Sequence, residues 1–203
     1  EIVFLSAMNK IILKTALKTL LALIIIFAVV FGALSIGYPS GMADFFEKSG
    51  NYSFAAGYAS LNYSYTGKTE DLARCVNDYI MAENDRNIIH FGGRLIEANG
   101  FDELCESESD RLGLDYRQFV YGSIACSKYR QNDSAGAIAA AEAAFTENGG
   151  FPVNNALVRL TVLAEKDYET LVKIRTSVGE ISPGEDEREY YDSVIKVLDK
   201  LID

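Results

Sequence analysis

The sequence predicts an all-α protein in which one membrane-spanning helix precedes a domain of paired antiparallel helices. Two observations support this prediction. A long uncharged apolar run lies near the start of the chain. Beyond Gly41, apolar residues recur at helical spacing, and alternating strand patterns are sparse. Turn residues interrupt this part of the chain roughly every fifteen residues.

The charge of the 203-residue chain is unevenly distributed, although its net value is −10. Residues 1–40 contain three lysines and one acidic residue, and residues 41–203 carry a net charge of −12. This asymmetry predicts two environments and a domain boundary near residue 40. The acidic balance also argues against nucleic acid as a partner, because phosphate binding needs a basic surface.

The first element is a predicted transmembrane helix from Leu20 to Ile36. Only Gly32 and Ser35 interrupt its apolar residues. Together with Thr19 the run would extend about 27 Å as a helix, close to the thickness of the hydrocarbon core. A single uncleaved anchor is the preferred interpretation. A cleaved signal peptide, which would release a secreted protein, and a buried core helix are the alternatives.

The residues that flank this run predict its orientation. Lys14 and Lys18 precede it, so the positive-inside rule places the N-terminal side in the cytoplasm and residues 41–203 outside it. Tyr38 follows the run, where an interfacial aromatic residue is common. The sequence Pro39-Ser40-Gly41 is expected to end the helix.

The remaining elements are predicted helices joined by short loops. Their expected ranges are 52–65, 69–82, 87–98, 101–106, 116–131, 134–147, 154–165, 168–178 and 185–202. At the start of the last helix, residues 182–185 (Ser-Pro-Gly-Glu) have the spacing of a capping box, with proline where the first helical residue belongs. We therefore expect a capping helix at the C-terminal end of the domain.

The turns between these helices recur with a period close to that of a helical repeat. The turn residues are Gly67, Gly100, Asn132 and Asp167, which are 33, 32 and 35 residues apart. Small residues precede three of the four turns by seven positions, at Ser60, Gly93 and Ala125 but not at Leu160. Large apolar residues precede three of them by four positions, at Tyr63, Ile96 and Leu163 but not at Lys128.

This pattern resembles the tetratricopeptide (TPR) repeat, which has two helices in a period of about 34 residues. The resemblance covers residues 52–178. It departs from the family in having no tryptophan and no closing proline after each unit. It implies an α-α solenoid of about four helix pairs, because one such hairpin cannot bury its apolar face alone.

The sequence offers little material for catalysis, so we expect no enzymatic activity, no cofactor and no metal. His90 is the only histidine, and Cys75, Cys105 and Cys126 have no metal-ligand spacing. The three cysteines are interpreted as buried small residues, with a disulfide as the alternative. Gly67-Lys-Thr69 lacks the earlier glycine of a phosphate-binding loop. Paired acidic residues are interpreted as solvated charge.

The resemblance implies a concave face lined by the first helix of each pair, where a peptide would bind. The corresponding groove residues are Leu61, Tyr65, His90, Arg94, Glu97, Tyr129 and Arg130, with Ser64 and Cys126 beside them. We therefore expect a membrane-anchored adaptor or assembly factor that binds a protein or peptide. A secreted all-α enzyme and a structural subunit of a membrane complex are the alternatives.

Overall fold

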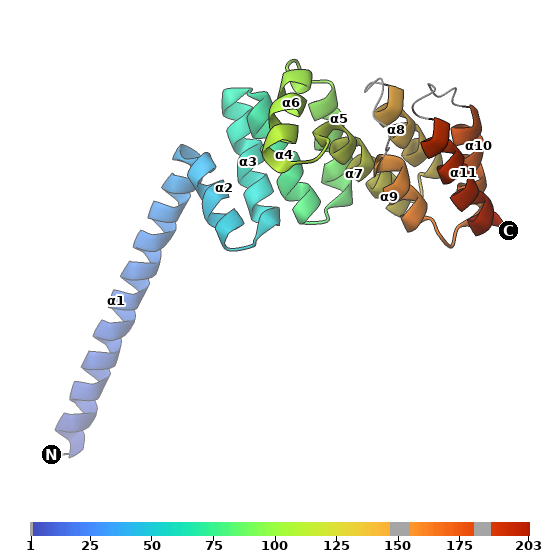
Figure 1. Cartoon of the computed structure of the whole chain (residues 1–203). Helices are drawn as coiled ribbons and strands as arrows, with labels where there is room; N and C mark the ends of the chain where they lie inside the picture. Colours follow the sequence, from blue (N-terminus) through green and yellow to red (C-terminus); the bar gives the residue numbers. More distant parts are fainter. Residues whose placement is uncertain (1, 147–154, 181–187) are drawn as a thin grey trace.

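The computed structural model describes residues 2–146, 155–180 and 188–203. Within these ranges the regular structure is entirely α-helical, which confirms the predicted all-α class (Figure 1). The helices are α1 (Ile2–Gly37), α2 (Pro39–Lys48), α3 (Tyr52–Thr66), α4 (Thr69–Met81), α5 (Asp85–Ile96), α6 (Phe101–Leu112), α7 (Tyr116–Arg130), α8 (Ser134–Thr146), α9 (Asn155–Leu163), α10 (Tyr168–Glu180) and α11 (Arg188–Ile202).

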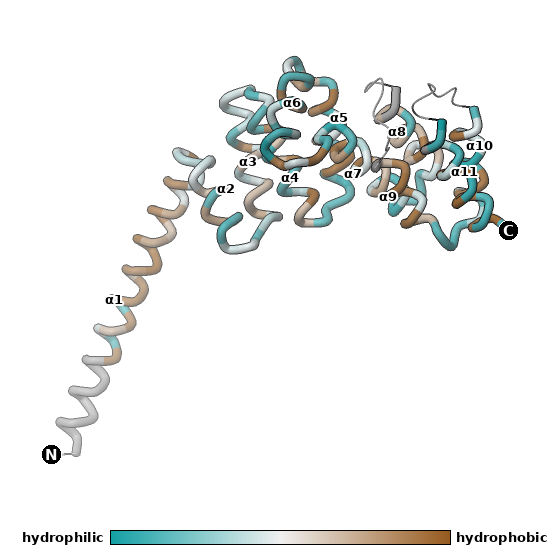
Figure 2. Tube along the Cα trace, in the orientation of Figure 1, coloured by the Kyte–Doolittle hydropathy of each residue, from teal (hydrophilic) through white to brown (hydrophobic). Residues whose placement is uncertain are grey.

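Helix α1 stands apart from the other helices as a single long rod (Figure 1). Its segment Leu13–Gly37 reaches a mean hydropathy of 2.8, and no residue of that segment is buried. The tube is mostly brown along this segment, in contrast to the mixed colouring of the domain (Figure 2). The helix is long and apolar enough to cross a membrane, and an N-terminal signal sequence would have the same properties.

The prediction that residues 39–41 break the helix is wrong, because the break lies at Tyr38 and residues 39–41 form the first turn of α2, a helix missing from the predicted elements. Tyr38 has non-helical dihedral angles, and Pro39 opens α2 at its first position. Proline is favoured at that position, because the first amide of a helix has no partner within the helix. Gly41 leaves room for the Tyr38 ring, which a β-carbon at position 41 would overlap.

The predicted turn residues adopt the backbone conformation that ends helices. Gly67, Gly100 and Asn132 have φ angles of 65°, 85° and 64°. This left-handed region is costly for residues with a β-carbon, and glycine and asparagine tolerate it best. The fourth turn works differently, because the Asp167 carboxylate accepts a hydrogen bond of 3.1 Å from the Thr170 amide and caps α10.

The packing of the helices agrees only in part with the predicted pairs. Helices α3 and α4 form one close pair and α7 and α8 another. Helix α5, however, packs mainly against α4 and α7, and α6 makes few contacts beyond α7 and α4. In the same way α9 packs mainly on α7, and α10 on α11. These arrangements differ from simple α5–α6 and α9–α10 hairpins.

Two glycines lie where non-consecutive helices approach each other closely. A β-carbon at Gly92 would lie 2.9 Å from a side-chain carbon of Ile124, and one at Gly122 would lie 3.0 Å from the Ala156 Cα. The small-residue position in α5 is therefore Gly92. The aligned residue, Gly93, has no atom within 4 Å of such a carbon.

The buried residues form one apolar cluster that runs from α2 to α11. Its largest fully buried aliphatic side chains include Leu72, Leu95, Leu160, Ile174 and Leu198. Helix α11 closes the described end of the cluster, and its Asp199 receives a hydrogen bond of 3.0 Å from Arg175 on α10. The predicted capping box at residues 182–185 lies outside the described residues.

Candidate functional site

The first five predicted groove residues lie on α3, on α5 and at the C-terminal end of α5. Four are exposed, namely Tyr65, His90, Arg94 and Glu97, and Leu61 is half-buried. The guanidinium of Arg94 lies 5.2 Å from the centre of the Tyr63 ring and so connects α5 to α3. Such a cation–π contact contributes about 0.5–1 kcal/mol at an exposed site.

The other two predicted groove residues join helices of the domain to one another. The Tyr129 hydroxyl donates a hydrogen bond of 3.1 Å to the Asp167 carboxylate. Arg130 holds Asp85 through its Nε, at 2.9 Å, and its Nη2, at 2.5 Å. No hydrogen bond, ion pair or ring contact among the described residues joins two of the seven. A peptide bound at Tyr129 and Arg130 would have to compete with these internal partners.

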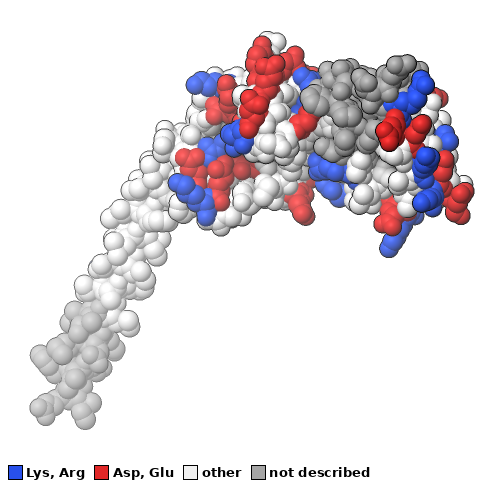
Figure 3. Space-filling model, viewed as in Figure 1, with Lys and Arg blue, Asp and Glu red and all other residues white. Residues whose placement is uncertain are grey.

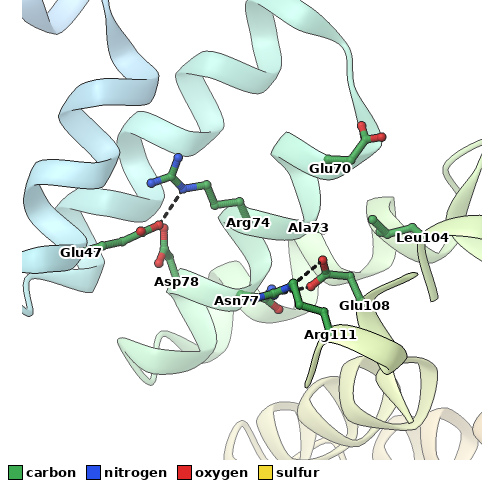
Figure 4. A pocket seen from close by; sticks show the side chains of 9 residues that line it. All are labelled: Glu47, Glu70, Ala73, Arg74, Asn77, Asp78, Leu104, Glu108 and Arg111. Carbon is green, nitrogen blue, oxygen red and sulfur yellow. Dashed lines mark hydrogen bonds and ion pairs between the residues drawn. The ribbon is translucent and has the colours of Figure 1, made fainter. Parts of the chain in front are cut away.

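A polar cavity that the sequence analysis missed lies between α2, α4 and α6 (Figure 4). Its volume is about 320 Å³. Glu47 and Asp78 face each other on one side of it, and Glu108 pairs with Arg111 on the other (Figure 4). The full lining comprises Glu47, Glu70, Ala73, Arg74, Asn77, Asp78, Leu104, Glu108 and Arg111.

Asp78 is the buried acid of this cavity. Its side-chain Oδ2 has no hydrogen-bond partner, and the residue is only 5% exposed. Burial, reinforced by the nearby Glu47 carboxylate, raises the pKa of Asp78 to about 7. Arg74 does not neutralise Asp78 through a hydrogen bond, because it donates to Glu47 and Asp44 at 2.6 and 2.5 Å. The Asp78 carboxyl therefore holds a proton at neutral pH more readily than an exposed acid does.

Sequence alone contained one signal for this group. Asp78 follows the buried Cys75 by three residues, a helical spacing, so it falls on the buried face of its helix. Glu47 and Glu108 are distant in sequence, and no local pattern places them beside Asp78. The cavity therefore combines one carboxyl that holds a proton, Asp78, with acidic and basic side chains that are paired with each other. Its lining, as far as the structure describes it, contains no histidine and no thiol.

An apolar groove lies between α9 and α11, at the end of the domain farthest along the chain from α1. Its volume is about 440 Å³. Val162 on α9 is 68% exposed and Val197 on α11 is 54% exposed. The lining comprises Val158, Thr161, Val162, Glu165, Ser193, Val194, Val197, Leu198 and Leu201. Two polar residues and one acidic residue interrupt an otherwise aliphatic surface of the kind that partner helices cover.

The described residues contain no group of three or more histidine, cysteine, aspartate or glutamate side chains that could hold a metal ion. The three cysteines form no disulfide, and all three are buried. Burial, reinforced by the Asp78 charge, raises the pKa of Cys75 to about 12, so its sulfur is a thiol at neutral pH. Such a buried thiol is a poor nucleophile.

Comparison with known proteins adds no relative. No protein family, no curated protein and no solved structure matches this chain.

Proposed function

We propose that this chain is a membrane-anchored helical-repeat protein, of TPR-like design, whose domain binds a helix of a partner protein. Helix α1 spans the membrane as a single anchor. The groove between α9 and α11 receives the apolar side of the partner helix. The activity is binding, and the chain performs no chemical reaction on its partner.

The main support for this proposal is the exposed aliphatic lining of the α9–α11 groove. Val162 and Val197 face solvent from neighbouring helices, although each belongs to a residue type that is usually buried. An amphipathic helix with apolar residues at positions i, i+3 and i+4 would cover both of them. Covering the exposed parts of Val162 and Val197 would contribute about 1 kcal/mol each, so a few such residues would dominate the affinity.

The anchor supports the same function by confining the groove to the membrane surface. Lys14 and Lys18 precede the apolar run and favour a cytoplasmic N-terminal side, with the domain outside the cytoplasm. A partner in the same membrane then meets the groove at a raised effective concentration, which strengthens a weak contact without new interactions. Domain charges cover much of the face shown in Figure 3, whereas the visible described part of α1 has almost none.

Site-specific photo-crosslinking in the native membrane tests the groove. A photoreactive phenylalanine analogue is placed at Val162 or Val197 in the full chain. We expect one discrete adduct with the same partner from both positions. With the probe at Val162, the substitution Val197→Asp should abolish the adduct, because it places a charge in the apolar contact.

Two further probe positions serve as controls. Tyr168 is 63% exposed on α10 and lies outside the groove lining, so a probe there should give no adduct. A probe at Tyr65 examines the predicted concave face. An adduct at Tyr65 but not at Val162 would move the partner to that face and contradict the groove proposal. Equal labelling at all four positions would show contact without a defined site.

A further inference from the structure

Three exposed aromatic rings lie where α1 meets the domain. Tyr38 is 60% exposed, Phe45 59% and Phe54 58%. Single exposed apolar side chains are common on protein surfaces. These three, however, belong to the junction of α1 and α2 and to the α2–α3 hairpin, the part of the domain that follows the apolar rod directly (Figure 1).

The rings of the hairpin form a fixed cluster around Phe46. Its ring is stacked on Phe54 at 5.2 Å and on Tyr58 at 5.5 Å, between ring centres, and Phe45 meets it edge-on at 5.2 Å. Aromatic pairs in such geometries contribute about 0.5–1.5 kcal/mol beyond their buried area. Phe45 and Phe54 therefore keep a defined orientation while more than half of their surface is open to solvent.

The cluster is tied directly to the apolar helix. The Tyr58 hydroxyl and the Ser35 hydroxyl lie 2.8 Å apart, within hydrogen-bond distance, which connects α3 to the last turn of α1. The Tyr38 amide donates a hydrogen bond of 2.8 Å to the Leu34 carbonyl and so holds the break residue to the last turn of α1. From the end of α1, helix α2 turns back and runs along the side of the domain that is nearest to α1 (Figure 1). The α2–α3 hairpin consequently sits beside the end of α1.

Helix α2 also has two chemically different sides. Asp44 and Glu47 bind Arg74 of α4, so the acidic side chains are paired toward the domain. Phe45 remains open, and Lys48 ends the helix near the polar α2–α3 turn. An aromatic side with a nearby cation is the composition that suits the headgroup layer of a bilayer, where rings partition and lysines reach phosphate groups.

We infer that the α2–α3 hairpin rests in the headgroup layer of the membrane, with Phe45 and Phe54 inserted beside the end of α1. The inference rests on the membrane anchoring in the proposed function. Lipid is the expected occupant of this surface because the cluster continues directly from the apolar helix. The contact fixes the tilt of the domain relative to the bilayer.

The absence of tryptophan from the chain allows a direct test. Phe45→Trp and Phe54→Trp each introduce a single fluorophore into the full chain, and Tyr168→Trp supplies a matched exposed control on α10. The variants are reconstituted into phosphatidylcholine vesicles, with or without lipids brominated near the top of the acyl chains. We expect bromination to lower the emission at positions 45 and 54 about twofold and to leave that at position 168 unchanged.

The outcomes separate this inference from the anchoring on which it rests. Flotation with the vesicles reports whether α1 anchors the chain. Flotation without quenching at positions 45 and 54 would leave the anchor standing and overturn the inference. Shielding of these positions from aqueous iodide without quenching by bromine would also overturn it, because a protein surface would then cover the rings. Far-UV circular dichroism confirms that each variant remains folded.

Discussion

At the residue scale, the proton held by Asp78 ties stability to pH. The ordinary pKa of an aspartate is 3.8, and that of Asp78 in the folded chain is raised to about 7. Between these values the folded protein retains a proton that the unfolded chain releases. The contribution of Asp78 to the free energy of unfolding therefore falls as the pH rises from about 4 to about 7, and the loss is complete above that range.

The substitution Asp78→Asn should remove this dependence. An amide of the same shape cannot ionise, so the variant should match the parent near pH 4 and exceed its stability at pH 8 by on the order of 1–3 kcal/mol. Urea unfolding of both proteins across this pH range measures the difference. The exposed Asp110→Asn substitution is the control and should change little at either pH. A deficit for Asp78→Asn at pH 8 would contradict the assigned protonation.

At the element scale, sequence predicted which segments are helical better than it predicted how they pack. The turn residues at 67, 100 and 132 were identified correctly, because a left-handed backbone favours glycine and asparagine. Helix α2 was missed, because Pro39 and Gly41 are typical of both a break and a helix start. The predicted α5–α6 hairpin is not the main packing of α5, which lies mainly on α4 and α7, because contacts such as Gly92 with Ile124 are not related by any local pattern.

The candidate sites were harder to predict for the same reason. Alignment to a repeat placed Tyr129 and Arg130 in a groove, but their side chains bind Asp167 and Asp85 on other parts of the domain. The polar cavity takes its walls from α2, α4 and α6, and the apolar groove takes its walls from α9 and α11. Each site combines helices that are not consecutive, so helical periodicity within one segment does not reveal it.

Two glycines in helix interiors should respond oppositely to alanine. Gly122→Ala places a carbon 3.0 Å from the backbone of α9, so α7 and α9 must separate, at a cost of about 1–3 kcal/mol. Gly93→Ala meets no atom within 4 Å and should stabilise α5 by up to about 1 kcal/mol through helix propensity. Thermal unfolding of the two variants and the parent measures both effects. Equal stabilisation by both substitutions would show that α7 and α9 do not approach closely.

At the scale of the whole molecule, the core of the domain does not include the apolar helix. The buried cluster begins in α2, and no residue in Leu13–Gly37 is buried. The folding free energy of the domain therefore comes from α2 to α11. Helix α1 contributes mainly the link from Ser35 to Tyr58 and its contacts with α2.

A chain that begins at Ser35 should therefore fold. We expect helical circular dichroism and a cooperative thermal transition within about 5 °C of that of the full chain in the same detergent. Removal of the apolar run should also leave the protein monodisperse without detergent, as size-exclusion chromatography would show. A broad transition, or loss of helical signal, would mean that α1 takes part in the fold. The full chain in detergent is the reference for both measurements.

The join between α1 and α2 has a mechanical consequence. Only Tyr38 separates the two helices, and its backbone is hydrogen-bonded to both, since its amide donates to Leu34 of α1 and its carbonyl accepts from Met42 of α2. So short a connection gives the two parts little freedom to turn independently, so a rotation of α1 about its own axis would carry α9–α11 around that axis. In the proposed anchored state, another transmembrane helix packed against α1 would therefore set the direction in which the groove between α9 and α11 faces.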